Sequence, residues 1–285
     1  MLTKLYCEIN DFCKNFIKEW HKELIGNFDC QMGICEIMTI VVQFHLSNMR
    51  TFKHFYQILE KYHKREFPTL LSYNRFVEMM PITILPLMVF LKQCKMGTNT
   101  GISFIDSTKL RVCHNKRINS NKVFKDIAKR GKDSTGWYYG FKLHLVINEH
   151  GEIINFTFSP ANVDDRKPVQ ELLKNLKGKV YADKGYISEE LAKALKNVQL
   201  IARPRKNMKK EIFDFDKIML RKRAIIETVN DQLKNICQLE HSRHRSPINF
   251  IVNAISSLVA YSFKEKKPSI FFNQKDIQQN NAITI

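Results

Sequence analysis

The hydrophobic pattern of the chain changes its period near Gly101, and this change most constrains the fold. Before it glycine is scarce, and apolar residues in the segment 34–45 recur with the three-to-four spacing of a helix. After it, residues 102–112 alternate between two sides with the period of a strand. The sequence therefore predicts an N-terminal all-helical region over residues 1–97 and an α/β domain over residues 98–265.

Within the second part, hydrophobic runs and turn residues predict the order β-β-β-α-β-α-β-α. The expected strands are 102–112, 139–147, 153–158, 179–183 and 198–202, and the expected helices begin near 164, 188 and 220. A loop is expected over residues 113–137. Three strands joined by hairpins and then alternating units describe a mixed sheet flanked by helices.

Local signals also predict structure at the two ends of the chain. In the helical region we expect a helix over 51–62 and a short helix that Ser72 caps and Pro81 ends. The polar segment 266–285, rich in Asn and Gln, is expected to be a flexible tail.

The charge balance indicates a polyanionic partner. Lys and Arg number 46 against 28 Asp and Glu, so the formal net charge is +18. Such an excess disfavours compaction through self-repulsion, so a fold does not need it. Nucleic acid is the first candidate partner and an anionic membrane surface the second.

Cysteine usage and hydropathy suggest an intracellular protein. The seven cysteines are odd in number and form no C-x-x-C pair, which favours thiols in a reducing cytoplasm over a disulfide framework. No apolar segment of signal-peptide type is expected at the start of the chain. The longest apolar run, 81–91, is too short to span a bilayer and contains two prolines, so no membrane association is expected.

Three carboxylates stand out by their positions, and each has an ordinary alternative. Asp106 lies within the first strand, where it could instead bond backbone amides. Asp183 ends the fourth strand beside a glycine turn, a usual place for ligand-binding residues, although it could cap the next helix. Glu227 lies on a late helix, on the same side as Arg223 and Lys234, where a solvated Arg–Glu pair is the alternative.

Together the three carboxylates suit a pair of hard divalent cations. Mg²⁺ prefers carboxylate and water oxygens and leaves positions open for phosphate, and Mn²⁺ can substitute for it. Two such ions can activate an attacking oxygen and stabilise a leaving oxygen in phosphodiester cleavage. Asp106, Asp183 and Glu227 are therefore the predicted catalytic and metal-binding residues.

Over about residues 100–263 the chain resembles bacterial insertion-sequence transposases of the DDE superfamily. The stretches that carry the resemblance are Phe104-Ile-Asp106-Ser-Thr108, 140–148, 159–165, 180–186 and Arg223-x3-Glu227-x6-Lys234. The last is similar to the Tyr-x2-Arg-x3-Glu-x6-Lys signature of one large branch, with Leu220 at the Tyr position.

The resemblance implies an RNase H-like catalytic domain in which Asp106, Asp183 and Glu227 are the metal ligands. It implies that Arg223 and Lys234 contact phosphates near the cleaved DNA end. Its implied partners are double-stranded DNA with terminal inverted repeats, target DNA, and a second copy of the chain in a homodimer on DNA. The N-terminal helices are expected to bind terminal-repeat DNA or to mediate dimerisation.

Two basic runs flank the carboxylates and suggest a track for DNA phosphates. Each single run could be only a solvated face, but nine basic residues lie between 107 and 132 and nine more between 203 and 223. Besides Arg223 and Lys234, the residues predicted to contact DNA are Lys142, Lys184, Arg130, Lys132, Arg203 and Arg205.

An aromatic pair and a Cys/His spacing are two further patterns in the sequence. Trp137 and Tyr138 are candidates to stack on a base, whereas the alternation from Tyr139 onward favours a core strand. Cys237, His241 and His244 have metal-like spacing, but a fourth ligand is missing from this pattern and zinc is disfavoured.

The sequence thus favours an active DDE transposase that cuts the ends of its element and joins them to target DNA, in the cytoplasm and associated with the nucleoid. A nuclease of RNase H-like fold that cleaves without joining is the second reading. A catalytically inactive DNA-binding protein derived from a transposase is the third, and the presence of all three carboxylates argues against it.

Overall fold

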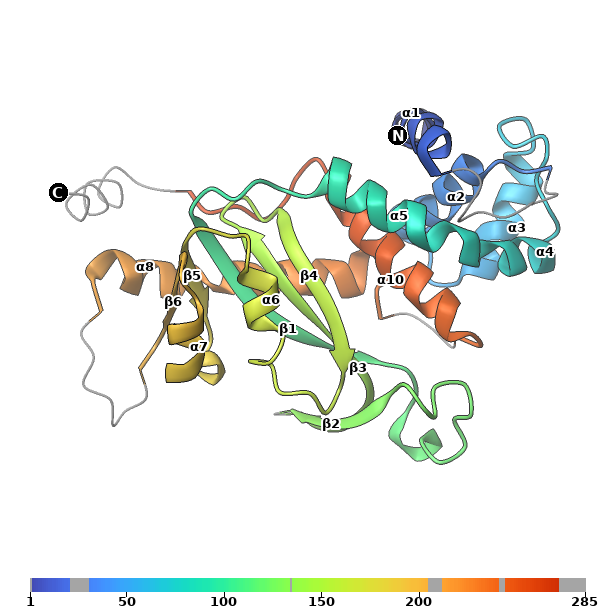
Figure 1. Ribbon diagram of the computed structural model, residues 1–285. Helices are drawn as coiled ribbons and strands as arrows, with labels where there is room; N and C mark the ends of the chain where they lie inside the picture. The colour runs from blue at the N-terminus through green and yellow to red at the C-terminus, as the bar shows by residue number, and fades with distance from the viewer. Residues whose placement is uncertain (1, 21–30, 134, 205–211, 241–243, 272–285) are drawn as a thin grey trace. The chain divides into compact units, whose positions relative to one another are not determined.

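The computed structural model describes residues 2–20, 31–133, 135–204, 212–240 and 244–271 (Figure 1). The chain forms two compact units, of which the first comprises Met1–Lys95 with Gln232–Lys264 and the second Met96–Asp231 with Glu265–Ile285. The segment Gln232–Lys264, which the sequence predicts as part of the α/β domain, is thus grouped with the N-terminal helices. The predicted flexible tail lies mostly outside the described residues.

The first unit is helical in its described residues, as its sequence pattern predicts. Its elements are α1 (Leu2–Trp20), α2 (Ile34–Leu46), α3 (Phe52–Tyr62), α4 (Tyr73–Met79), η1 (Met80–Thr83), α5 (Ile84–Phe90), η2 (Leu91–Lys95), η5 (Gln232–Ile236) and α10 (Pro247–Ser262). The helices α2 and α10 contact each other and are buried along most of their length, so they form the core of this unit.

The predicted stop at Pro81 is only partly correct. Ser72 caps α4 as expected, with its hydroxyl accepting a hydrogen bond from the Arg75 amide at 3.4 Å. Pro81 ends the α-helical geometry, but the chain continues as a 3-10 turn and then α5, because proline at the start of a turn loses no necessary donor. Among the described residues, this continuous run Tyr73–Lys95 is the one that by length and composition alone could cross a membrane; it is partly buried, as core helices of soluble proteins are.

The second unit is built on a mixed sheet. Its strands are β1 (Ile102–Arg111), β2 (Lys129–Asp133), β3 (Gly136–Asn148), β4 (Ile153–Pro160), β5 (Gly178–Ala182) and β6 (Val198–Ala202). β4, β3 and β1 are antiparallel neighbours, whereas β1, β5 and β6 run parallel. The five predicted strands are confirmed, and the mixed sheet with flanking helices is RNase H-like.

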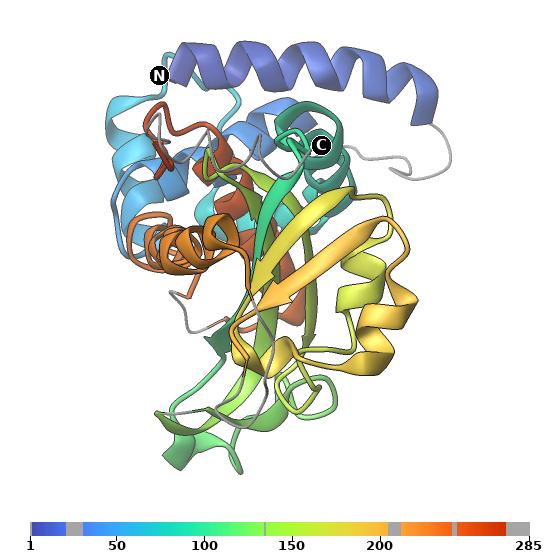
Figure 2. The same ribbon diagram turned by 90° about the vertical axis from the view of Figure 1, so that its left-hand side faces the viewer.

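Helices cover both faces of this sheet (Figures 1 and 2). On one face, α6 (Val169–Leu173) and α7 (Glu189–Ala194) close a buried apolar cluster over β1, β3 and β5. On the other face lie α8 (Asp214–Lys222) and α9 (Ala224–Asp231), and the Tyr181 hydroxyl of β5 donates to Asp216 of α8 at 2.8 Å. β1 is therefore a central strand whose side chains are held on both faces.

Strand β2 corrects the prediction of a loop over 113–137. Its residues pair with the first part of β3, from Lys129 opposite Gly140 to Asp133 opposite Gly136. Gly140 pairs with Arg111 of β1 and with Lys129 of β2, next to the end of the pairing of β3 with β4. Its φ is +155°, and a Cβ there would lie 2.0 Å from the Leu110 carbonyl oxygen. Only glycine fits this close approach of two backbones.

A buried histidine on β3 makes the stability of this unit depend on pH. The His144 side chain is 1% exposed, and its Nε2 lies 2.8 Å from the Ser159 hydroxyl. Burial lowers the pKa of His144 to about 4; Asp165 opposes this shift and Lys142 adds to it. The neutral imidazole is therefore the form that the fold accepts.

We expect the contribution of His144 to the free energy of unfolding to fall by about 2 kcal/mol between pH 7.5 and pH 5, because the unfolded chain binds a proton near pH 6.5 that the folded chain rejects until about pH 4. In His144→Gln this contribution should disappear, as urea unfolding at both pH values would measure. His150→Gln, at an exposed histidine, is the matched control and should keep the slope of the parent. An unchanged slope in His144→Gln would contradict the assignment.

Candidate active site

Asp106 lies in the central strand β1, on the face of the sheet that α9 covers. Its Oδ2 accepts a hydrogen bond from Asn230 Nδ2 of α9 at 3.4 Å. Asp106 pairs with Leu145 of β3 and lies two residues beyond Phe104, where the pairing of β1 with β5 ends. The carboxylate is thus presented from a fixed position within the sheet.

Asp183 directly follows β5, the parallel neighbour of β1. Its side chain is exposed and makes no capping hydrogen bond to the short turn η4 (Lys184–Tyr186) that comes next. The following helix has its own cap, since the Ser188 hydroxyl accepts from the Leu191 amide at 3.3 Å. The alternative role of Asp183 as a helix cap is therefore not what the structure shows.

Glu227 lies in the first turn of α9 and is paired with Arg223. Arg223 Nη2 donates to Glu227 Oε1 at 2.8 Å, and the Arg223 side chain is 18% exposed against 59% for Glu227. The Arg–Glu pair that the spacing allows is thus present. The positive charge of Arg223 also acts on Asp106, where it opposes the rise of the pKa of that carboxyl.

The charges of all three carboxylates act on one another at Asp106. The pKa of Asp106 is raised to about 6, mainly by burial and to a smaller extent by the negative charges of Glu227 and Asp183. Arg223 and the Ser107 amide oppose this shift. The three predicted residues therefore share one electrostatic environment, in which negative charge is in excess.

The residues of this site fit a hard divalent cation in their chemistry, although they are not gathered into a coordination sphere. Among the described residues, no three His, Cys, Asp or Glu side chains are close enough together to hold a metal ion. A cation would offset the repulsion that raises the pKa of Asp106. Beside the site, the buried Oδ1 of Asn230 has no hydrogen-bond partner in the part of the chain that the structure describes, which costs about 1–3 kcal/mol unless a ligand or water supplies one.

Four of the eight predicted DNA-contacting residues are exposed, and some of the others are engaged within the protein. Lys142 donates to Asp165 at 2.8 Å and to the Val163 carbonyl at 2.9 Å. Lys234 pairs with Glu240 at 3.2 Å and belongs to the other compact unit, so its place relative to the carboxylates is not defined. Arg205 lies outside the described residues; the exposed members of the set are Lys184, Arg130, Lys132 and Arg203.

The segment 111–133, which we call the basic hairpin, presents most of the first basic run. Its exposed cations are Arg111, Lys116, Arg117, Lys122, Lys125, Lys129, Arg130 and Lys132. Trp137 on β3 is 59% exposed, with Lys132 Nζ 5.7 Å from its ring centroid. Tyr138 is 2% exposed, so it is not available to stack on a base.

Of the three residues with zinc-like spacing, His241 lies outside the described residues. Cys237 is buried, and burial raises the pKa of its thiol to about 11, which disfavours the thiolate that zinc requires. The cysteines that the structure describes are not joined in disulfides.

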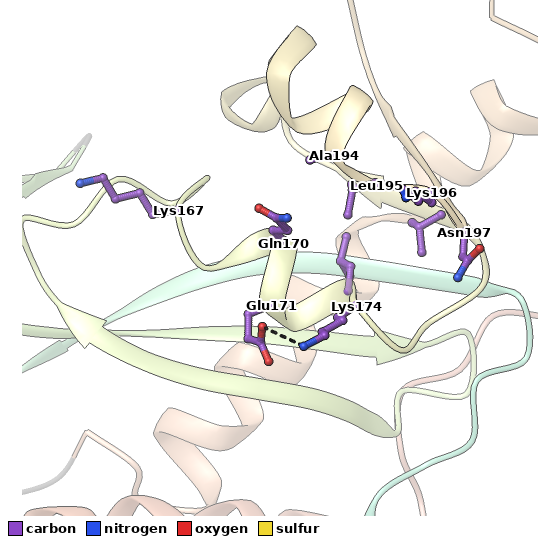
Figure 3. A pocket seen from close by; sticks show the side chains of 10 residues that line it. Lys167, Gln170, Glu171, Lys174, Ala194, Leu195, Lys196 and Asn197 are labelled. Carbon is purple, nitrogen blue, oxygen red and sulfur yellow. Dashed lines mark ion pairs between the residues drawn. The ribbon is translucent and has the colours of Figure 1, made fainter.

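A hollow of about 500 Å³ lies away from the three carboxylates, between α6 and the segment that follows α7 (Figure 3). It is lined by Lys167, Lys174 and Lys196, and Glu171 pairs with Lys174 at 3.9 Å. None of the predicted site residues lines it.

Two neutral side chains at the site were missed by the sequence reasoning. Asn230 contacts Asp106. Tyr186 is 3% exposed, and the pKa of its hydroxyl is raised by burial first and then by the negative charges of Asp106 and Asp165. Tyr186 lies inside the stretch 180–186, so its motif was available as a signal. Asn230 follows Glu227 by one helical turn, a spacing that marks a neighbour on the helix surface.

Comparison with known proteins identifies the family of the chain. A family model described as a transposase DDE domain matches residues 96–247, more than half of the chain and the part that contains all three carboxylates. The curated proteins contain no match to the chain. DDE transposase domains generally use divalent metal ions and act on DNA. The chain belongs to the family of transposase DDE domains.

Proposed function

We propose that the protein is a DDE transposase that cleaves the ends of its insertion element and joins them to target DNA. The observation that carries the proposal is that Asp106 in β1, Asp183 directly after the neighbouring strand β5 and Glu227 on α9, which packs on β1, all lie within the segment that matches the family model. Three carboxylates, one in β1, one directly after β5 and one on α9, would be the donor set for two Mg²⁺ ions, with Mn²⁺ as a substitute.

In this function the chain's own residues have distinct roles. Asp106, Asp183 and Glu227 would hold the cations, which when bound activate the attacking oxygen and stabilise the leaving oxygen. The Arg223 guanidinium, now on Glu227, can form a two-pronged contact with a phosphate at the cleaved end, and Lys234 would hold the same end as a point charge.

The basic hairpin and Lys184 supply further phosphate contacts. Their exposed cations are not base-specific, so they would fix the position of DNA, with an affinity that falls steeply as salt rises. Lys142 would join them only by leaving Asp165. The proposed partners are DNA with terminal inverted repeats, target DNA and a second copy of the chain, in the cytoplasm at the nucleoid.

A strand-transfer assay separates this function from the second reading, a nuclease that does not join. Pre-cut duplexes that end in the inverted repeats flanking the gene are incubated with a supercoiled plasmid and Mg²⁺. We expect covalent joining of repeat ends to the plasmid, and none with duplexes of scrambled end sequence. Cleavage of uncut ends without any joined product would favour the nuclease.

The two domains are proposed to have different roles. We assign DNA chemistry to residues 98–265 and terminal-repeat binding or dimerisation to residues 1–97. Because Gln232–Lys264 packs with the N-terminal helices, the C-terminal part of the matched segment would connect these two roles.

A further inference from the structure

Asn230 is an isolated amide beside the carboxylate of Asp106. It lies on α9 one turn after Glu227, and its side chain is 7% exposed. Its Nδ2 is the donor to Asp106 Oδ2 at 3.4 Å, across 124 positions of the sequence. At about 100° per residue, Asn230 lies between the buried Ile226 and the exposed Glu227 on the helix surface.

Packing alone does not explain an amide at this place. The neighbouring buried residues of α9 are Ile225, Ile226 and Val229, and a leucine would fill a similar volume without a polar atom. The Asn230 Oδ1 atom is buried and has no hydrogen-bond partner among the described residues. The Nδ2 atom is thus hydrogen-bonded to Asp106, whereas the Oδ1 atom accepts no hydrogen bond from the described residues.

We propose that Asn230 is a positioning residue of the metal centre. Its Nδ2 fixes the orientation of the Asp106 carboxylate, and its Oδ1 accepts a hydrogen bond from water bound to the divalent cation. The inference rests on the proposed function, since it requires that Asp106 hold a cation. A neutral amide supplies a donor and an acceptor here without adding a fourth negative charge to Asp106, Asp183 and Glu227.

The test is the affinity of the full-length protein for Mn²⁺, measured without DNA by electron paramagnetic resonance of the unbound ion. Groups that orient metal ligands typically change metal affinity 10–100-fold when they are removed. We expect the Mn²⁺ dissociation constant of Asn230→Leu to rise at least about tenfold. The melting temperature in EDTA should show that the variant is folded.

Asn253→Leu is a matched control. Asn253 is 8% exposed, and its Nδ2 donates to the Leu239 carbonyl at 3.4 Å, so this variant also removes one buried amide and its hydrogen bond. We expect its Mn²⁺ affinity to equal that of the parent. Asn230→Ser, which keeps a shorter hydroxyl donor and acceptor, is expected to lose less affinity than Asn230→Leu and is the deciding variant if Asn230→Leu does not fold.

Two outcomes overturn the inference: Mn²⁺ affinity within twofold of the parent in the folded Asn230 variant, or an equal loss in Asn253→Leu. Asp106→Ala separates this failure from failure of the proposed function. If Asp106→Ala loses Mn²⁺ binding while the Asn230 variant keeps it, the metal site stands and the positioning role is wrong. If Asp106→Ala binds Mn²⁺ as the parent does, the proposed metal site itself is wrong.

Discussion

Replacement of Asp106, Asp183 or Glu227 by alanine is expected to abolish cleavage and joining, with a loss of at least about a thousandfold for each. Each substitution would remove one ligand of the same metal centre, so the losses of activity should not add. A double variant should therefore be no less active than a single one. DNA affinity should remain near that of the parent, since the contacts that dominate it come from Lys and Arg.

Cleavage of a labelled inverted-repeat duplex at saturating protein measures the chemistry, and a gel-shift titration at fixed salt measures binding. Asp231→Ala is the matched control, because Asp231 is an exposed carboxylate on the same helix, one turn from Glu227. We expect Asp231→Ala to cleave normally. Normal cleavage by Glu227→Ala together with its loss in Asp231→Ala would move the third role to Asp231.

The strands that carry the site were predictable because their hydrophobic residues repeat with a period set by the sheet. β1 alternates through Phe104, Asp106 and Thr108, so the position of a carboxylate in a buried strand is visible in the sequence. The helix caps at Ser72 and Ser188 were visible for a similar reason, since a cap acts over three residues.

Elements that depend on distant partners were not predictable. β2 reads Lys-Arg-Gly-Lys-Asp and has no apolar residue, so only its pairing with β3 makes it a strand. Regular helical spacing from residue 220 onward would put Ile236 on the same apolar face as Ile225 and Val229. Ile236 is 39% exposed, because α8 ends at Lys222, α9 ends at Asp231 and a π-helical turn follows. A change of helical period rotates a side chain out of the face that regular spacing assigns to it.

The same distinction holds within the candidate site. The three carboxylates could be predicted because their residue type and spacing indicate a hard-cation site. The roles of Asn230 and Lys142 could not, because the contact of Asn230 with Asp106 and that of Lys142 with Asp165 arise only when the chain folds. The electrostatic coupling of Asp106 to Glu227 likewise depends on α9 crossing β1.

Removal of divalent cations is expected to abolish cleavage completely and reversibly. Without a cation, burial and the negative charges of Glu227 and Asp183 oppose ionisation of Asp106, and the positive charge of Arg223 favours it. Bound Mg²⁺ or Mn²⁺ would supply more positive charge and the open positions that a phosphodiester needs. Activity lost in EDTA should therefore return with either ion in excess.

Ca²⁺ tests whether the cation has a role in chemistry beyond neutralising charge. Its larger radius and loose, seven- or eight-fold coordination should allow it to neutralise the carboxylates and support DNA binding, but not to hold two oxygens in the geometry of in-line displacement. We expect gel-shift affinity with Ca²⁺ equal to that with Mg²⁺ and no cleavage. In thermal unfolding, a cation at 100 times its dissociation constant should stabilise the parent by about 2.7 kcal/mol and leave Asp106→Ala unaffected. Undiminished cleavage in excess EDTA would show that these carboxylates act without a metal. Equal stabilisation of Asp106→Ala would show that the cation binds without Asp106.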